Sequence, residues 1–309
     1  RVRRGSTRKN YRHEYSSKHL IGSEKFVRGC FLKINWKIIN RIMSIKTATR
    51  SVSATGFRYV VEARIRNMLK WSRIIIFVAI ANPILYLLSI GVGVGSLIDS
   101  KNSLDGVAYL TFLAPALLAS AAIQGMLDEV IFPTFQGFKW FKNFFAMNAT
   151  PLTGSDIAGG VFVAALLRTT FTVVIYWIAL YFFGALDSPT AWLAIPAAIF
   201  AGASFGAFIL ALVARAKNDD VFMMITGRFV VMPMFLFSGT FYPLDLMPTF
   251  LQWIGWISPL WHATDLGRFL TYGHEISTTT LIFHLVYMFA LLVVGLYFAF
   301  RNYTKRLAK

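Results

Sequence analysis

The 309-residue chain contains a single cysteine, Cys30. One cysteine excludes an internal disulfide and any site built from several cysteines, such as an iron–sulfur cluster. Charged residues are also scarce, since Asp, Glu, Lys and Arg together make up 15% of the sequence. Apolar residues make up 56%, and the mean hydropathy is +0.58. This balance excludes an ordinary soluble domain and indicates an integral membrane protein.

The sequence also lacks the motifs of a nucleotide-binding or catalytic centre. No GxxxxGKS or GxxxxGKT motif occurs, so the chain has no Walker A loop of its own. Gly91, Gly93 and Gly95 resemble part of a phosphate-binding loop, but no strand is predicted before them. We assign these glycines to close packing between helices. We therefore expect no enzyme site, cofactor or metal in this chain.

Histidines and acids form no evident catalytic set. His262, His274 and His284 lack metal-ligand spacing, so we expect them in core or surface positions. Two pairs of adjacent acids, Asp128/Glu129 and Asp219/Asp220, lie at predicted cytoplasmic ends of apolar runs. Adjacent side chains point apart on a helix, so we expect solvated interface charges rather than acid–base dyads.

Six apolar runs are long enough to cross a bilayer, which requires roughly 20 residues in a helix. The predicted spans are residues 74–98, 106–127, 157–183, 190–214, 221–241 and 276–300. The fold class is therefore all-α, an integral membrane protein with six transmembrane helices. About seventy residues, rich in Lys and Arg, precede the first run, which is too long and too basic for a cleavable leader, so we expect a retained helix.

The distribution of basic residues predicts the orientation. With the amino end inside, 27 of the 31 Lys and Arg residues lie on the predicted cytoplasmic side, and only Lys101 and Arg268 lie outside. Cytoplasmic loops retain Lys and Arg, so we expect both termini in the cytoplasm. The net charge of +17 is then mainly a topology signal, and we expect no nucleic-acid partner.

A basic head, residues 1–55, precedes the membrane domain, which we place at residues 56–309. Residues 1–25 have the composition of a flexible arm. Between residues 27 and 45, apolar side chains recur opposite Lys33, Lys37 and Arg41. This pattern is typical of a helix lying on anionic lipid, and equally of a helix packed on a partner protein.

Residues 56–72 predict a second amphipathic helix. Glu62 lies four residues before Arg66 and four after Arg58, a spacing that stabilises a helix. Because this helix leads directly into the first span, we interpret it as an interfacial elbow helix. A cytoplasmic extension of the first span is the alternative.

The longest internal cytoplasmic segment, residues 128–156, is rich in aromatic side chains. We predict a short helix at 138–147 with an exposed aromatic and basic face, and such a face requires a partner protein. The residues of this predicted contact are Phe138, Lys139, Phe141, Lys142, Phe144 and Phe145. Pro151 ends the region, and Thr153 or Ser155 is a candidate cap for the third span.

Two arginines lie inside predicted spans, Arg168 in the third and Arg228 in the fifth. The six predicted runs contain no acid to pair with them. An arginine at this depth costs several kcal/mol and usually faces protein or water. We predict that one or both line a path for an anionic group such as a lipid-linked phosphate. Snorkelling, or hydrogen bonding to carbonyls at a helix interface, is the alternative.

The stretch at 235–268 follows the fifth span but stays apolar. Pro243 and Pro248 interrupt regular helix, and three tryptophans suit the headgroup region. We predict short re-entrant helices on the outer side that cap the path, or tryptophans that serve only as interfacial anchors. The residues of this region are Tyr242, Pro243, Asp245, Pro248, Trp253, Trp256 and Trp261.

The order of these parts resembles an ABC-2 type transporter permease. The sequence SGTFYPLDLMPTFLQWIGWISPLWHATDLGR at 238–268 is most similar to the lipo-oligosaccharide exporter branch, with drug-exporter permeases of the daunorubicin type close behind. The resemblance covers about residues 56–305, and the head at 1–55 departs from the usual pattern.

That resemblance implies a permease subunit of an ATP-driven exporter in the bacterial cytoplasmic (inner) membrane. It implies a second permease copy, membrane lipids as neighbours, and two copies of a separate ATPase subunit that carries ATP and Mg. The ATPase would contact residues 138–147, and the outer re-entrant helices would lie at 242–261. An ion-coupled carrier or a membrane scaffold is the alternative from another functional class.

Overall fold

The computed structural model describes residues 55–95, 97 and 106–308. The chain divides into two units, Arg1–Ser51 and Val52–Lys309, and all described residues belong to the second. The helix predicted at 27–45 lies outside the described residues. The described part is helical throughout, without a strand, as the sequence predicts.

Six helical segments are long and apolar enough to cross a membrane, which confirms the predicted number of spans. They are Ser72–Ile90, Tyr109–Trp140, Gly154–Phe182, Ala191–Val213, Asp219–Phe237 and Thr278–Leu307. The first contains α4 (Ser72–Tyr86) and the start of the π-helical η1 (Leu87–Val94), the second α6 (Tyr109–Phe135) and η2 (Gln136–Trp140), the third α8 (Gly154–Phe182), and the fourth η3 (Ala191–Leu193) and α9 (Ala194–Val213). The fifth contains α10 (Asp219–Ile225), η4 (Thr226–Val231) and α11 (Met232–Phe237), and the sixth is α14 (Thr278–Leu307).

The second span is longer than predicted. It continues past residue 127 to Trp140, because Asp128 and Glu129 find partners and do not end the helix. The break comes at Lys142, whose φ of 53° is left-handed, and α7 (Asn143–Asn148) follows it. The predicted helix at 138–147 is therefore wrong in its first half, which belongs to the end of the second span.

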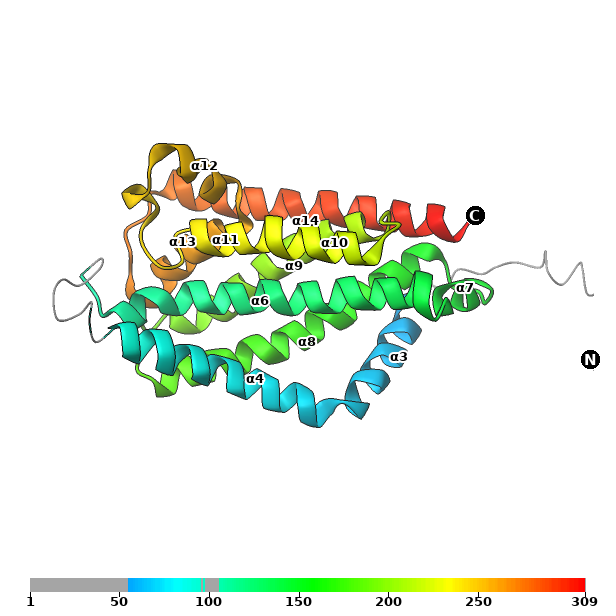
Figure 1. Cartoon of the computed structure of the whole chain (residues 1–309), viewed down its shortest axis with the longest axis horizontal. Helices are drawn as coiled ribbons and strands as arrows, with labels where there is room; N and C mark the ends of the chain where they lie inside the picture. The colour runs from blue at the N-terminus through cyan, green and yellow to red at the C-terminus, as the bar shows by residue number, and fades with distance from the viewer. Residues whose placement is uncertain (1–54, 96, 98–105, 309) are drawn as a thin grey trace, which may run out of the picture. The chain divides into compact units, whose positions relative to one another are not determined.

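The centre of the bundle consists of α6 and α9 (Figure 1). In the most apolar window of each span, 72% of the second and 61% of the fourth is buried, against 17% of the first and 11% of the fifth. Small residues bring the central helices together. A Cβ added at Gly202 of α9 would lie 2.8 Å from the Ala122 carbonyl oxygen of α6, so this approach requires glycine.

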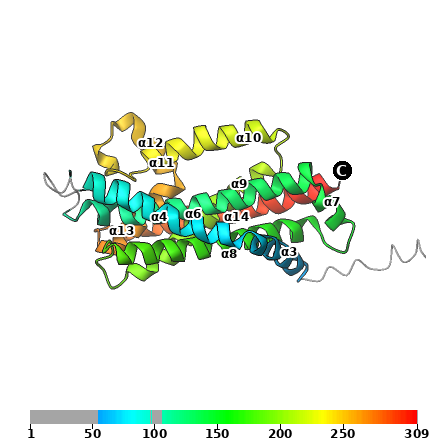
Figure 2. The same ribbon diagram turned by 60° about the horizontal axis from the view of Figure 1, so that its bottom comes forward.

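The helix α3 (Gly56–Lys70) precedes the first span and packs against α8. A Cβ added at Gly160 of α8 would lie 2.4 Å from Cβ of Val60, so the two helices meet closely. The carboxyl end of the chain and α7 lie toward the same end of the bundle as α3 (Figures 1 and 2). The predicted helix at 56–72 is thus confirmed as a helix, and its place at the membrane surface stays a prediction.

At the opposite end, residues between the fifth and sixth spans form short helices. They are η5 (Leu244–Leu246), α12 (Thr249–Ile257) and α13 (Pro259–Tyr272). Pro243 and Pro248 occupy the N-cap positions of η5 and α12, and Pro259 begins α13 behind the capping Ser258. The prolines therefore start helices as well as interrupt the fifth span.

Candidate functional site

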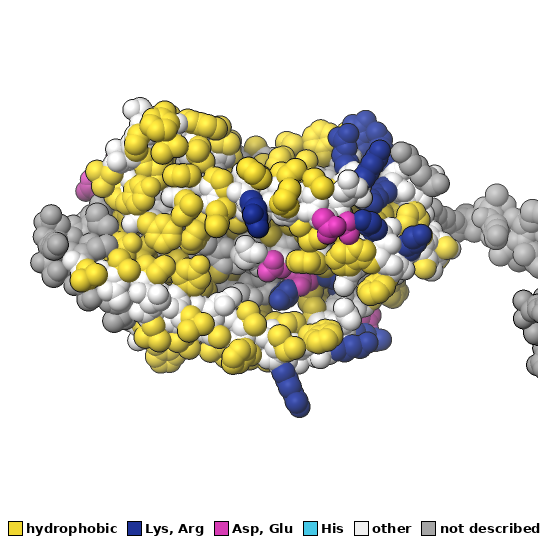
Figure 3. Space-filling view, in the orientation of Figure 1, with side chains coloured by type: hydrophobic (Ala, Val, Ile, Leu, Met, Phe, Trp, Pro, Cys, Tyr) yellow, Lys and Arg dark blue, Asp and Glu magenta, His cyan; other side chains and the backbone are white. Residues whose placement is uncertain are grey.

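A cavity of about 320 Å³ lies between α4 and α11, with α6 and α8 at its back. Figure 3 shows a hollow on this side of the molecule, with apolar side chains on both rims and acidic and basic side chains within it. The polar side chains that line the cavity are Asn82, Tyr86, Ser120, Gln124, Asp128, Arg168, Thr172 and Tyr176. Polar groups at membrane depth are costly and usually functional, so this cavity is the candidate site.

Some of these polar groups form hydrogen bonds within the protein, and others are available to bind a ligand. Gln124 donates to Asp128 over 2.9 Å, and the Ser120 hydroxyl donates to the Ala116 carbonyl of its own helix over 2.7 Å. Tyr176 is only 5% exposed, yet its hydroxyl forms no hydrogen bond with any residue in the described part of the chain. A buried phenol that faces a cavity is a natural partner for a ligand or water.

Behind the cavity, Glu129 of α6 joins two arginines from two other helices. Arg64 of α3 donates to one carboxylate oxygen over 2.9 Å, and Arg168 of α8 forms a short ion pair with the other. Burial lowers the pKa of Arg64, and the charge of Glu129 opposes that effect. The expectation of a solvated Glu129 and an unpaired Arg168 is wrong, because the second span extends beyond both acids and holds Glu129 in the interior.

Arg228 has a different setting from Arg168. Its side chain is exposed on η4, and no carboxylate within residues 55–95 and 106–308 pairs with it. Its neighbour Gly227 lines the cavity, whereas Arg228 itself does not. The structure therefore places one of the two predicted path residues, Arg168, at the cavity.

The aromatic segment after the second span divides into a buried and an exposed set. Phe138 and Phe144 are buried, with ring centroids 5.1 Å apart, and both contact Tyr303 of α14. The side chains of Phe141, Lys142 and Phe145 are exposed, and Phe141 is 72% exposed. Lys139 and Trp140 are exposed as well, although both bond Asp219, so a partner protein can reach residues 139–142 and Phe145.

The acid pair at the start of the fifth span also divides. Asp220 is exposed as expected, but Asp219 is buried and accepts a hydrogen bond from the Trp140 indole over 2.8 Å. Lys139 forms a short ion pair with the same carboxylate. Asp219 therefore links the second and fifth spans by side-chain bonds and is not a solvated charge.

The sequence of this chain is similar to those of known proteins. The family model described as ABC-2 type transporter matches residues 55–272, from the residue before α3 to the end of α13. This chain belongs to the ABC-2 type transporter family. Nodulation protein J of Rhizobium leguminosarum bv. viciae is 28% identical over 245 residues, which cover 75% of this chain and 88% of that protein. Nodulation protein J of Rhizobium meliloti (strain 1021) is 25% identical over 231 residues, or 74% of this chain and 86% of that protein.

A transport permease from another bacterium is also similar. The inner membrane transport permease YadH of Escherichia coli (strain K12) is 28% identical over 180 residues, which cover 54% of this chain and 64% of that protein. This ABC-2 type protein is therefore a component of membrane transport.

The outer region of this ABC-2 type chain shows two kinds of tryptophan. Trp253 and Trp256 of α12 are exposed, whereas Trp261 is half-buried and lies edge-on to His262 and His284. Asp245 is exposed, and Tyr242 is half-buried. We find both anchor-like and interior positions in this set.

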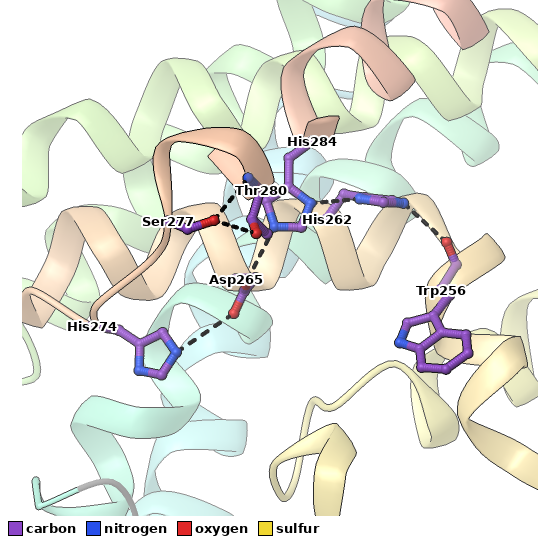
Figure 4. Close-up of polar contacts among 7 residues, drawn as sticks. All are labelled: Trp256, His262, Asp265, His274, Ser277, Thr280 and His284. Carbon is purple, nitrogen blue, oxygen red and sulfur yellow. Dashed lines mark hydrogen bonds and ion pairs between the residues drawn. The ribbon is translucent and has the colours of Figure 1, made fainter. Parts of the chain in front are cut away.

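A histidine cluster that the sequence does not predict lies at this end of the ABC-2 domain. His262 of α13, His284 of α14 and Asp265 of α13 form a connected chain of hydrogen bonds (Figure 4). The His274 Nε2 atom lies 3.9 Å from the same Asp265. The expectation of core or surface positions is confirmed for His262 and His284, which are both buried. Their contact with each other and with Asp265 was not predicted, because it requires a helix that places residues 262 and 265 on one face and a sixth span that returns beside it. The spacing of His262 and Asp265 is the only local signal in the sequence.

Proposed function

We propose that this protein is the permease subunit of an ATP-driven ABC exporter that moves an amphipathic substrate outward. A lipid-linked glycan or similar amphiphile is the substrate class, and a drug carried by the same family is the alternative. The cavity carries this proposal, because its walls differ in chemistry. Apolar side chains such as Ile75 and Phe235 line it from α4 and α11, whereas Asp128, Arg168 and Tyr176 line it from α6 and α8. A molecule with an apolar tail and a polar head matches both.

The head group need not be anionic. Two arginines, Arg64 and Arg168, share Glu129, and Asp128 brings a second carboxylate to the cavity wall, so two acids face two guanidinium groups there. Hydroxyl and amide groups of a glycan can use Tyr176, Asn82 and Asp128 as hydrogen-bonding partners. This argument favours a neutral, polar head over the phosphate considered from the sequence.

The open side of the cavity supports a second copy of the permease. The first and fifth spans are the flanking helices, and their most apolar windows are 17% and 11% buried. Exposed large side chains on them include Phe77, Leu85, Phe229 and Met232. A second copy facing this side would enclose the cavity within a homodimer, with membrane lipid around it.

A separate ATPase supplies energy in this proposal, with ATP and Mg bound to two ATPase copies. The exposed Phe141, Lys142 and Phe145 form its contact on the permease, at the end of the bundle that carries α3 and α7. Both termini then lie in the cytoplasm of a bacterial inner membrane. In this placement α3 is the elbow helix and α12–α13 are re-entrant caps on the outer side.

The test is export into inverted vesicles or proteoliposomes that contain the permease and an ATPase encoded beside its gene. We expect transport that requires ATP hydrolysis and persists without an ion gradient. The carboxylates Asp128 and Glu129 within the second span make an ion-coupled carrier the competing hypothesis. Transport that follows an imposed proton or sodium gradient in the absence of any ATPase would establish that alternative.

A further inference from the structure

The histidine cluster joins three helices at the end of the bundle that carries α12 and α13. His262 Nε2 lies 3.0 Å from the carbonyl oxygen of Trp256 in α12. His262 Nδ1 lies 2.6 Å from His284 Nδ1 in α14, and His284 Nε2 lies 3.0 Å from Asp265 Oδ2 in α13 (Figure 4). Both imidazoles are fully buried, so these contacts do not compete with solvent.

The acceptors at the two ends of this series of hydrogen bonds determine how many protons the two imidazoles hold. A carbonyl oxygen only accepts, so His262 Nε2 carries a hydrogen. An ionised carboxylate also only accepts, so His284 Nε2 carries one as well. The two remaining nitrogens, both Nδ1, lie 2.6 Å apart, and a bond between them requires one hydrogen. Three hydrogens on four nitrogens give the pair one positive charge, which the carboxylate of Asp265 balances.

A metal ion does not explain the pair. Two imidazole nitrogens bound to one tetrahedral zinc ion, each at about 2.0–2.1 Å, lie about 3.3 Å apart. The observed 2.6 Å is a hydrogen-bond distance. Among the described residues, no group of three or more His, Cys, Asp or Glu side chains is placed to hold a metal ion.

Asp265 is the acid that contacts the pair formed by His262 and His284. The Tyr287 ring of α14 stacks on His262 with centroids 4.1 Å apart, and its hydroxyl bonds the Ile257 carbonyl. The guanidinium of Arg268 on α13 donates to the Gly239 carbonyl and lies over the ring of Phe112.

The remaining titratable groups are few. His274 is the next one, at 3.9 Å from the other oxygen of Asp265. The helices α12 and α9, which pack on α13, contain no titratable side chain. The helix α6 also packs on α13, and its Tyr109 hydroxyl donates to the Phe241 carbonyl. Glu275, in the loop before α14, is exposed.

We propose that His262 and His284 form a binding site for a single shared proton, and that this proton latches α12 and α13 to the sixth span. Loss of the proton brings two nitrogen lone pairs together, or turns one toward the Asp265 carboxylate. Gain of a further proton brings two N–H groups and two positive charges together. Either change breaks a buried hydrogen bond and loosens the short helices. This inference concerns the chain alone and does not rest on the proposed transport function.

A direct test is solid-state NMR of the full chain in lipid bilayers with 15N-labelled histidine. His262→Gln and His284→Gln assign the two signals. We expect both Nε2 atoms to be protonated at neutral pH and the two Nδ1 atoms to share one proton. Two neutral imidazoles, or two imidazolium ions, near neutral pH would overturn the proposal. If either variant fails to fold, the wild-type spectrum still tests the proposal, because two Nδ1 atoms that share one proton are coupled to each other.

A second test is thermal unfolding of the purified full chain between about pH 4 and pH 9. Burial, and then the electrostatic effect of the neighbouring His284, lower the pKa of His262 to about 4. An unfolded histidine has a pKa of about 6.5, so the unfolded chain binds more protons between these values and stability falls as the pH drops through that window. We expect the unfolding temperature to fall by roughly 3–10 °C as the pH drops through this window.

Three variants make this second test specific. His284→Gln and His262→Gln keep a polar side chain that does not titrate, so we expect a flatter pH profile for both. His19→Gln, outside the described part of the chain, is the matched control and should keep the wild-type profile. A His284→Gln profile that parallels the wild type would contradict the latch.

Discussion

Arg168 and Glu129 face each other across the boundary between the third and second spans, and Glu129 also holds Arg64 of α3. A single carboxylate thus contacts two partly buried guanidinium groups from separate helices. Removing it leaves both cations close together without a partner, whereas removing one arginine leaves a complete pair. The consequences of substitution in this cluster are therefore unequal.

Glu129→Gln should destabilise the fold by about 3–5 kcal/mol, because it leaves buried charge uncompensated. We expect Arg168→Gln to cost less, since Glu129 keeps Arg64. Unfolding temperature in detergent measures both. The control is Glu62→Gln, which breaks an exposed pair with Arg66 and should change stability by less than about 0.5 kcal/mol. Equal losses from Glu129→Gln and Glu62→Gln would mean that the cluster is solvated.

Phe141 and Phe144 should respond differently to replacement by serine. Phe144 is buried against Phe138 and Tyr303, so Phe144→Ser should destabilise the protein by roughly 3–5 kcal/mol. Phe141 is exposed, so Phe141→Ser should keep the unfolding temperature and weaken co-purification of the ATPase. Full ATPase binding by both Phe141→Ser and a Phe145→Ser variant would place the contact elsewhere.

Tyr176→Phe should preserve the fold and weaken substrate binding, because it removes a hydroxyl that no described residue uses. Loss of one hydrogen bond to the ligand of about 1 kcal/mol corresponds to a roughly fivefold rise in the apparent KM for transport. The matched control is Tyr303→Phe, whose hydroxyl lies 2.6 Å from that of Thr134. The control should lower stability and leave KM unchanged. The reverse pattern would remove Tyr176 from the site.

Gly202→Ala should separate the two central helices. The added Cβ would lie 2.8 Å from the Ala122 carbonyl oxygen, and backbone on both sides leaves little room for relief. We expect a loss of about 1–3 kcal/mol in unfolding measurements. Gly227→Ala, where nothing lies within 4 Å of the added Cβ, should be tolerated. A neutral Gly202→Ala would show that α9 can move away from α6 at little cost.

The number of spans was predictable because hydrocarbon thickness sets the length of an apolar helix. The helix at Gly56–Lys70 was predictable for a similar reason, since its charges recur with helical spacing. The end of the second span was not. A run of hydropathy ends at Asp128, but the helix continues to Trp140 because Glu129 meets two arginines that lie far away in sequence.

The site was predictable only in part, and the missing part depends on tertiary contacts. Arg168 could be identified as unusual from its position in an apolar run, whereas its partner could not. Phe138 and Phe144 are the same residue type as Phe141 and Phe145, so the sequence does not distinguish them. The first two are buried because α14 passes beside them and places Tyr303 against both rings. The histidine chain likewise depends on α14 passing beside α13.

The bonds of Asp219 also connect the predicted partner contact to the fifth span. This residue begins the fifth span, and its partners Lys139 and Trp140 are the last residues of the second span before the break at Lys142. These contacts join the second and fifth spans at the end that carries α7, and the Tyr109 hydroxyl, which donates to the Phe241 carbonyl, joins the same two parts of the chain at the other end. We expect a partner that binds the segment around Phe141 to act on the start of the fifth span through Lys139 and Trp140, because both of these residues bond Asp219.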